Sequence, residues 1–263
     1  MTMLQLVVLA IVQGITEFLP ISSEGHLIIT SQVLGWPDQG LALDLATNAG
    51  TLAAVIVFFR RDLIALLVGL GERGSQSTRP LVGMLIVATI PAGLAGLLLD
   101  STFGQESLRQ AWIIATTTLV FGIVLWLADR FGMTVRRVEH MTWRSAIFIG
   151  FAQVLALIPG TSRSGITMSA ARIMGFEREA AARFSLLMAI PLIGAAVLLG
   201  VLKIRDAADA ELTGSALIVA GIAFVTALMA LAAMMAWLRR ASFTPFVIYR
   251  LLLGGGLLLW LYA

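Results

Sequence analysis

The residues best suited to chemistry gather in two short stretches of an otherwise apolar sequence. The first stretch runs from Gln13 to His26 and contains two side chains that can move a proton, Glu17 and His26. Gln13 and Glu17 are four residues apart, so on a helix their side chains share one face. Pro20 ends that helix, because proline cannot continue the hydrogen-bond ladder. The stretch therefore predicts a helix that has a carboxylate near its C-terminal end.

A pair of serines follows the proline and begins a second helix. Ser22 and Ser23 can cap this helix, whose free backbone N–H groups then form a site for an anion. His26 lies in its first turn. Ser23 is a candidate nucleophile as well as a cap, and the two roles do not exclude each other.

The second stretch has the composition of a phosphate-binding loop. Glycines let the backbone approach a ligand, hydroxyls donate hydrogen bonds, and an arginine offers a bidentate fork to phosphate oxygens. A further helix begins here and adds the positive end of its dipole. Arg163 is a candidate catalytic residue. The candidate substrate-binding residues are Gly160, Ser162, Ser164 and Thr167 of this stretch, together with Gln13 and Ser22 of the first. Together the two stretches suit phosphoryl transfer.

The composition places both stretches in a membrane protein. Apolar residues make up 59% of the 263 residues, and charged residues make up 13%, about half of the roughly 25% usual in soluble domains. The net charge of +3 does not indicate a nucleic-acid partner, because the arginines lie mostly in loops between apolar segments. The absence of cysteine excludes disulfides and thiolate metal sites. Residues 1–12 lack the features of a cleaved leader and are expected in the mature protein.

Six segments are apolar and long enough to cross a bilayer, which takes about 20 helical residues. They are Leu43–Phe59, Leu81–Leu99, Ala111–Ala128, Phe184–Leu202, Leu212–Leu238 and Pro245–Tyr262. Two further regions, 1–34 and 145–174, are apolar but broken in the middle. Broken backbone survives at membrane depth only where protein or water surrounds it. We therefore expect an all-α membrane protein with two re-entrant helix–loop–helix hairpins, although the first arm of region 1–34 could be a marginal full span.

The two broken regions match each other at an offset of 140 residues, which indicates an internal repeat. The chain would then form a single membrane domain, 1–263, with one repeat half over 1–130 and the other over 144–263. A spanning segment follows each hairpin. The matching pairs include Gln13 with Gln153, Ser22 with Ser162, Gly25 with Gly165 and Gly35 with Gly175.

Arginine and lysine are unevenly distributed between alternate linkers. Linkers 60–80, 130–144, 172–183 and 239–240 contain four, four, three and two, whereas 36–41, 100–110 and 203–211 contain none, one and two. Because positively charged loops tend to stay in the cytoplasm, both termini are expected outside. The halves would then be inverted relative to each other, with the hairpin tips meeting near the midplane. The site is expected to open to the outer, periplasmic side of the bacterial plasma membrane.

The two polar stretches resemble the signature regions of the undecaprenyl-diphosphate phosphatase family, which is also known for bacitracin resistance. The resemblance rests on residues 13–26 and on Pro-Gly-Thr-Ser-Arg-Ser-Gly at 159–165, and it extends along the chain through 58–62 and 246–250. It implies hydrolysis of undecaprenyl diphosphate to the monophosphate, the lipid carrier of peptidoglycan assembly. It also implies a divalent cation, Mg²⁺ or Ca²⁺, as cofactor.

The resemblance also implies roles for single residues. Gln13 and Glu17 match the family's Glu/Gln-x-x-x-Glu motif, and Glu17 would bind the metal. The positions that match those assigned to catalysis or phosphate binding are Ser23, His26, Arg163 and Thr167. Glu24 departs from the family, which more often has Thr or Ser there, and its carboxylate could add a metal ligand. Arg250 lies within a predicted span, where it could bind phosphate or extend to the membrane surface.

A lipid transporter is the main alternative, because inverted repeats with hairpins at the midplane also build transporters. Such a protein would move a polyprenyl-phosphate lipid across the membrane. A carrier does not need a carboxylate, a serine and an imidazole beside an arginine, and this favours the hydrolase. The predicted partners are a polyprenyl diphosphate substrate and membrane lipids. The sequence does not decide whether the protein forms a homodimer. Ser23, His26 and water are all candidate nucleophiles.

Overall fold

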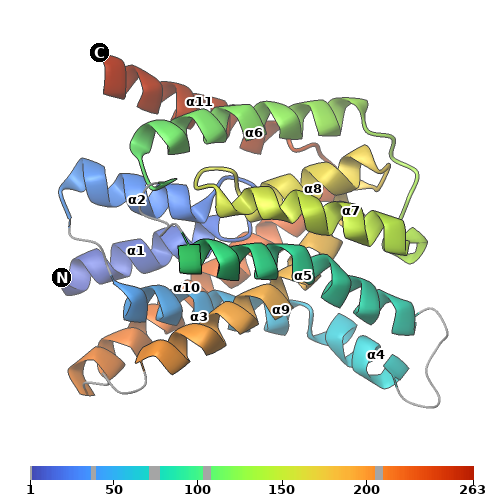
Figure 1. The fold of residues 1–263 in the computed structure, drawn as a ribbon, viewed down its shortest axis with the longest axis horizontal. Helices are drawn as coiled ribbons and strands as arrows, with labels where there is room; N and C mark the ends of the chain where they lie inside the picture. Colours follow the sequence, from blue (N-terminus) through green and yellow to red (C-terminus); the bar gives the residue numbers. More distant parts are fainter. Residues whose placement is uncertain (1, 37–39, 71–77, 103–107, 205–209) are drawn as a thin grey trace.

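The computed structural model describes the chain apart from residues 1, 37–39, 71–77, 103–107 and 205–209 (Figure 1). Its helices are α1 (Met3–Thr16), α2 (Ser23–Leu34), α3 (Leu41–Phe58), α4 (Arg60–Leu70), α5 (Thr78–Thr102), α6 (Ala111–Phe131), α7 (Trp143–Val154), α8 (Arg163–Ile173), α9 (Arg178–Ile204), α10 (Ala210–Leu238) and α11 (Thr244–Tyr262). Short 3-10 turns occur at Val138–His140 and Leu155–Leu157. The described residues contain no strand, only an isolated bridge between Arg136 and Phe176.

Six of the described helices are long and apolar enough to cross a membrane, which confirms the predicted all-α membrane fold. The apolar spans are Leu41–Phe58, Pro80–Leu99, Ala111–Phe131, Arg178–Leu202, Gly214–Leu238 and Thr244–Tyr262. The largest difference from the sequence prediction is in the fourth span, where the helix begins at Arg178 instead of Phe184. The extra turns carry charged residues that find partners: Arg178 pairs with Asp129, and Arg183 pairs with Asp62.

Two pairs of short helices, α1–α2 and α7–α8, pack against the long helices (Figure 1). These arms have 14, 12, 12 and 11 residues. At ~1.5 Å per residue each is shorter than the ~30 Å hydrocarbon core, as the predicted re-entrant hairpins require. The re-entrant placement and the internal repeat remain predictions. We call residues 17–23 the first tip and residues 158–164 the second tip.

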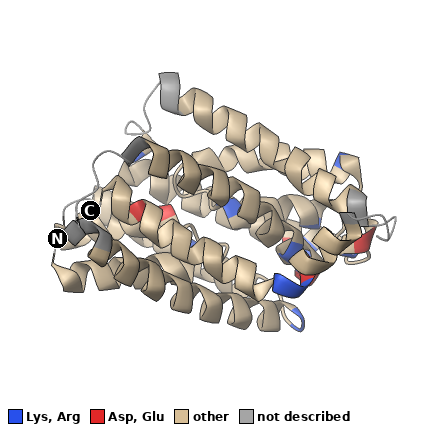
Figure 2. Cartoon of the chain, turned by 90° about the horizontal axis from the view of Figure 1, so that it is seen from below, with Lys and Arg blue, Asp and Glu red and all other residues tan. Residues whose placement is uncertain are grey.

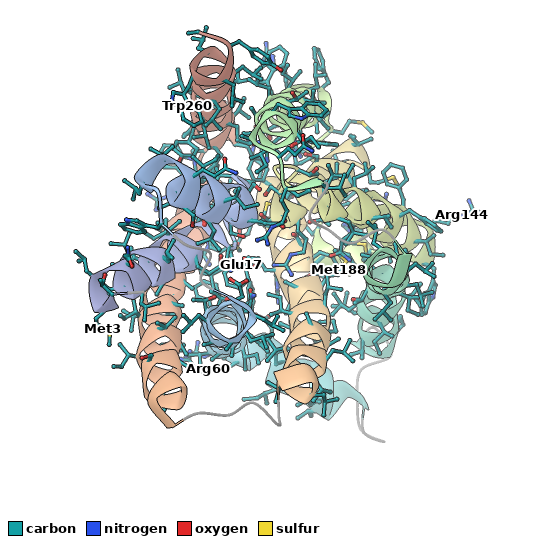
Figure 3. All side chains as sticks on the ribbon, turned by 60° about the vertical axis from the view of Figure 1, so that its left-hand side comes forward. Met3, Glu17, Arg60, Arg144, Met188 and Trp260 are labelled. Atoms are coloured by element: carbon teal, nitrogen blue, oxygen red, sulfur yellow. The ribbon has the colours of Figure 1, made fainter. Side chains whose placement is uncertain are left out.

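The long helices surround the two tips. Helix α1 packs against α10, which in turn packs against α3, whereas α8 packs against α6 and α9, and α11 covers α6. Figure 3 shows Glu17 in the middle of the bundle, whereas Met3, Arg144 and Trp260 lie at its periphery. The side chain of Glu17 is only 10% exposed. The fold therefore places the first predicted catalytic carboxylate in the interior.

Charged side chains are concentrated at one end of the bundle. Both termini lie at the opposite end, where Lys and Arg are sparse among the residues that the structure describes (Figure 2). Ion pairs join linkers that the sequence identifies as positively charged: Arg137 pairs with Glu177, and Arg239 pairs with Glu179. This distribution agrees with an even number of spans and supports the expected separation of charged and uncharged loops.

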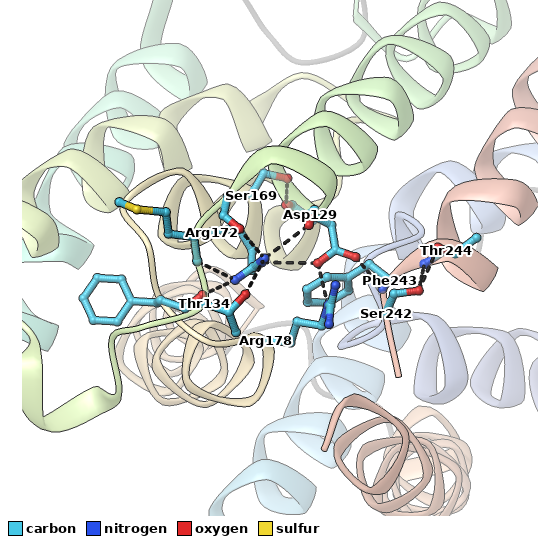
Figure 4. A network of polar contacts seen from close by, with 12 residues as sticks. Asp129, Thr134, Ser169, Arg172, Arg178, Ser242, Phe243 and Thr244 are labelled. Atoms are coloured by element: carbon cyan, nitrogen blue, oxygen red, sulfur yellow. Dashed lines mark hydrogen bonds and ion pairs between the residues drawn. The ribbon is translucent and has the colours of Figure 1, made fainter. Parts of the chain in front are cut away.

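A buried network at the charged end fixes the far end of α8. One oxygen of Asp129 accepts from Arg172 Nε at 3.2 Å and Arg178 Nε at 2.7 Å, and the other accepts from the backbone N–H of Phe243 at 3.1 Å (Figure 4). The side chain of Arg172 is 0% exposed and also donates to backbone carbonyls, including that of Met133. The network joins the ends of α6 and α8 to the beginnings of α9 and α11. It therefore stabilises the end of α8 that lies farthest from Arg163.

Candidate active site

Each tip contains a serine with an unusual backbone conformation. Ser22 has φ 74° and Ser162 has φ 69°, and each side chain accepts a hydrogen bond from the backbone of a glycine, Gly25 at 3.4 Å or Gly165 at 3.1 Å. A positive φ in a residue other than glycine costs on the order of 1–3 kcal/mol and is found most often at functional sites. Ser22 thus caps α2, so the hydroxyl of Ser23 is free for another contact.

Glu17 is the centre of the polar contacts at the first tip. Its Oε2 accepts from Gln13 Nε2 at 2.8 Å and from Ser23 Oγ at 2.7 Å. Gln13 also donates to Asn48 Oδ1 of α3 at 3.1 Å. The shared helical face of Gln13 and Glu17 that the spacing predicts is therefore present. A hydroxyl that donates to a carboxylate is the arrangement of a nucleophile beside its base.

An ion pair joins the two tips. Arg163 Nη2 lies 2.7 Å from Glu17 Oε1, and the two side chains are 17% and 10% exposed. Ser164 Oγ adds a second link by donating to the backbone carbonyl of Leu19 at 2.8 Å. The two stretches that suit phosphoryl transfer, far apart in the sequence, therefore meet in one place.

A small cavity of about 80 Å³ lies between the tips. It is lined by Glu17, Ser22, Ser23, Glu24, Ala156, Ile158, Gly160, Ser162 and Arg163. The volume exceeds the ~10–15 Å³ that one water needs. Helices α2 and α8 both begin at this cavity, so their free N–H groups and positive dipole ends favour an anion there.

Gly160 is required by the shape of the second tip. It has φ 88°, and a Cβ atom at this position would lie 2.1 Å from Thr117 Oγ1 and 2.5 Å from the carbonyl oxygen of Ile114. Thr117 Oγ1 also donates to the carbonyl of Pro159 at 2.6 Å. The glycine therefore lets α6 approach the tip closely, and a side chain here would push the two apart.

His26 faces Tyr249 of α11, a residue that the sequence did not single out. Its Nδ1 lies 2.6 Å from the carbonyl oxygen of Ser22, and its Nε2 lies 2.5 Å from the Tyr249 hydroxyl. Because a carbonyl can only accept, Nδ1 donates and Nε2 accepts from the tyrosine. The rings also stack, with centroids 5.5 Å apart. His26 therefore holds the turn that precedes Ser23, although it does not line the cavity.

The structure thus brings six predicted site residues to the cavity and adds Glu24. The six are Glu17, Ser22, Ser23, Gly160, Ser162 and Arg163. Gln13 does not line the cavity but donates to Glu17, and Ser164 links the tips by donating to the carbonyl of Leu19. Thr167 is fully buried and contacts Ser185 of α9 at 2.6 Å, so it does not reach the cavity. Arg250 is also fully buried, and among the described residues its guanidinium donates only to backbone carbonyls.

The residues at the cavity fit a divalent cation only if the substrate completes the site. Among the described residues no group of three His, Asp or Glu side chains could hold a metal. Glu17 and Glu24 both line the cavity. Gln13 does not line it, although its buried Oε1 has no hydrogen-bond partner among the described residues. Mg²⁺ is commonly held by one or two carboxylates together with substrate phosphates. This set of oxygen donors suits such a site.

The fold and the site together define an integral membrane protein with a polar pocket enclosed by two helical tips. The chain belongs to the family of the bacitracin resistance protein BacA, whose model matches residues 6–256. It is 51% identical to the undecaprenyl-diphosphatase of Hahella chejuensis over the whole of both chains. It is 48% identical to that of Alcanivorax borkumensis over 98% of each chain, and 45% identical to that of Alteromonas mediterranea over the whole of both. The family resemblance is confirmed.

Proposed function

We propose that this chain hydrolyses undecaprenyl diphosphate to undecaprenyl phosphate and phosphate, and so recycles the lipid carrier of peptidoglycan synthesis. One observation carries the proposal: Glu17 accepts from Ser23 on one tip and pairs with Arg163 on the other. This arrangement places a base, a nucleophile and a phosphate-binding cation around one cavity. The full-length relatives named undecaprenyl-diphosphatase support the substrate.

The diphosphate binds between the tips. Arg163 offers its fork to the phosphate oxygens, and Ser162 and the free N–H groups at the starts of α2 and α8 complete the cradle. Arg163 exchanges part of its contact with Glu17 for a contact with the incoming anion. The prenyl chain stays among the long helices and the lipid, because the cavity itself is too small to hold it.

Ser23 Oγ attacks the terminal phosphorus and transfers its proton to Glu17, 2.7 Å away. The bond between that phosphorus and the bridging oxygen breaks, and undecaprenyl phosphate leaves. Water then attacks the phosphoserine, Ser23 regains a proton, and phosphate is released. His26 orients the Ser22 carbonyl at 2.6 Å, and it shares in proton transfer only after its Nε2 separates from Tyr249. Direct attack by water is the competing route.

Glu17 and Glu24 would hold a Mg²⁺ or Ca²⁺ ion together with the diphosphate. Such an ion would neutralise the charge of the phosphate oxygens. Arg163 and the helix N-termini supply the remaining positive potential at the cavity.

The proposal is tested by phosphate release from undecaprenyl diphosphate with the purified protein in detergent and Mg²⁺. We expect release that is proportional to the amount of protein. A protein that only transports lipid would release no phosphate, and that result would favour the transporter alternative.

We also propose that the protein lies in the bacterial plasma membrane with the cavity opening to the outer side. Cysteines introduced into this cysteine-free chain at the two ends of α6 test the orientation. Gln110→Cys, at the exposed N-cap, should react with a membrane-impermeant maleimide on whole cells. Met133→Cys, which replaces a side chain that is 69% exposed, should react only after permeabilisation. The reverse pattern would mean that the cavity opens to the cytoplasm.

A further inference from the structure

Arg250 of α11 is fully buried, and its guanidinium contacts only backbone carbonyls in the described structure. An arginine side chain has five N–H donors. The five hydrogen bonds run from Nε to Thr118 at 3.1 Å, from Nη1 to Pro20 at 3.2 Å and Thr161 at 3.0 Å, and from Nη2 to Thr117 at 3.4 Å and Gly160 at 2.9 Å. Every donor is therefore in use, and none is left for a phosphate.

The five carbonyls come from three separate segments. Pro20 belongs to the first tip, Gly160 and Thr161 belong to the second tip, and the remaining two belong to α6. Five carbonyl dipoles that point at one place would repel each other without a cation between them. The convergence of these segments therefore depends on the charge of Arg250.

The surrounding chain leaves room for this side chain at two glycines. A Cβ atom at Gly165 of α8 would lie 3.0 Å from Arg250 Nη1, and one at Gly122 of α6 would lie 3.1 Å from Arg250 Cβ. Both distances are shorter than ordinary van der Waals contact. Gly165, which the sequence identifies as part of the phosphate-binding stretch, thus also accommodates the arginine.

We propose that Arg250 is a positioning residue that fixes the two tips relative to each other, and that it does not bind the substrate phosphate. Its contact at Pro20 lies three residues from both Glu17 and Ser23 in the sequence. Its contacts in the second tip directly precede Ser162 and Arg163. One buried cation thereby sets the distance between the base and nucleophile on one side and the phosphate-binding arginine on the other. This inference rests on the proposed function.

The kinetic test compares Arg250→Gln with the wild type. A misplacement of about 1 Å at the reacting groups lowers the rate about 10²-fold, so kcat should fall by about that factor. KM should stay within about threefold, because the phosphate ligands themselves remain. A large rise in KM with kcat preserved would instead identify Arg250 as a substrate ligand and overturn the proposal.

The distance between the tips provides a readout that does not depend on activity. Spin labels on cysteines at Ile15 and Leu155, which are 42% and 41% exposed, report on the first and second tip. We expect a narrow distance distribution in the wild-type background and a broader or shifted one with Arg250→Gln. An unchanged distribution would overturn the proposal even if catalysis were impaired. If the wild type released no phosphate, the proposed function would fail, and this measurement would still decide whether Arg250 holds the tips.

Two further variants separate positioning from general stability. Arg250→Lys retains the charge but has three donors, so it should fold and show the same changes to a smaller degree. It replaces Arg250→Gln if that variant does not fold, and wild-type kcat and tip distance in Arg250→Lys would then reject the proposal. Arg172→Gln is the matched control, because Arg172 is equally buried and also binds carbonyls, but at the far end of α8. It should lower the melting temperature and leave the tip distance unchanged. A shift in the tip distance as large as that of Arg250→Gln would show that general loss of stability moves the tips, and the positioning role of Arg250 would be rejected.

Discussion

Replacing Glu17 by glutamine is expected to lower kcat by about 10²–10⁴-fold, the range for loss of a positioned acid–base group. The amide preserves the size of the side chain, but it cannot take the Ser23 proton and does not carry the charge that pairs with Arg163. The measurement is phosphate release at saturating undecaprenyl diphosphate, expressed per amount of folded protein. The loss should appear in kcat, because Glu17 acts mainly on the reacting groups.

A matched control for this variant is Glu179→Gln. Glu179 also pairs with an arginine, Arg239 at 3.1 Å, but both side chains are well exposed. Surface ion pairs contribute only about 0–1 kcal/mol, so this variant should behave like the wild type. Melting temperatures must accompany the kinetics, because loss of Glu17 leaves Arg163 without its partner in a largely buried place. Wild-type kcat in folded Glu17→Gln would show that Glu17 is not the base, and the proton of the nucleophile would have to go to another group.

The sequence predicts the fold well because the membrane imposes a simple requirement on it. Segments that cross the hydrocarbon core must satisfy their backbone hydrogen bonds internally and remain apolar for about 20 residues, so they can be read from composition. The helix ends are less predictable. The fourth span begins six residues earlier than expected, since Arg178 and Arg183 are accepted into the helix by ion pairs with distant acids.

The part of the site that depends on local spacing was also predictable. Gln13 and Glu17 face the same way because they are four residues apart on one helix. The approach of Arg163 to Glu17 follows from two broken helices whose polar tips must find polar surroundings inside the membrane. The distribution of positively charged loops predicts that the two hairpins enter the membrane from opposite sides, so that their tips face each other.

Contacts between distant backbone segments could not be predicted from the sequence. The sequence left two roles open for Arg250, and neither is the one suggested by its five carbonyl contacts. Thr167 points at Ser185 and His26 at Tyr249, because the packing of α9 and α11 determines which face of α8 and α2 is covered. Such partners depend on how whole helices dock, which residue type and spacing do not specify.

Replacing Ser23 by alanine is expected to abolish nearly all turnover, with kcat lower by at least about 10³-fold, since loss of a serine nucleophile leaves only binding and charge stabilisation. The hydroxyl donates to Glu17 at 2.7 Å, and Ser22, not Ser23, caps α2. The variant therefore removes the nucleophile without removing the cap, and alanine is a good helix former at this position. Rapid quenching with labelled diphosphate should trap a phosphorylated protein in the wild type, and peptide mapping should locate the phosphate on Ser23.

The outcome distinguishes the three candidate nucleophiles. Ser31→Ala, in the same helix, controls for loss of a serine hydroxyl in α2 and should remain active. Ser22→Ala should lose about 1 kcal/mol of stability as a cap, together with a smaller part of the activity. A label found on His26 would transfer the nucleophilic role to the imidazole and require the contact with Tyr249 to open. A loss of less than about tenfold in Ser23→Ala, with no phosphorylated protein, would mean that water attacks directly. In that case Glu17 would have to accept the proton of the water instead of the serine proton, and its position at the centre of the cavity contacts allows this.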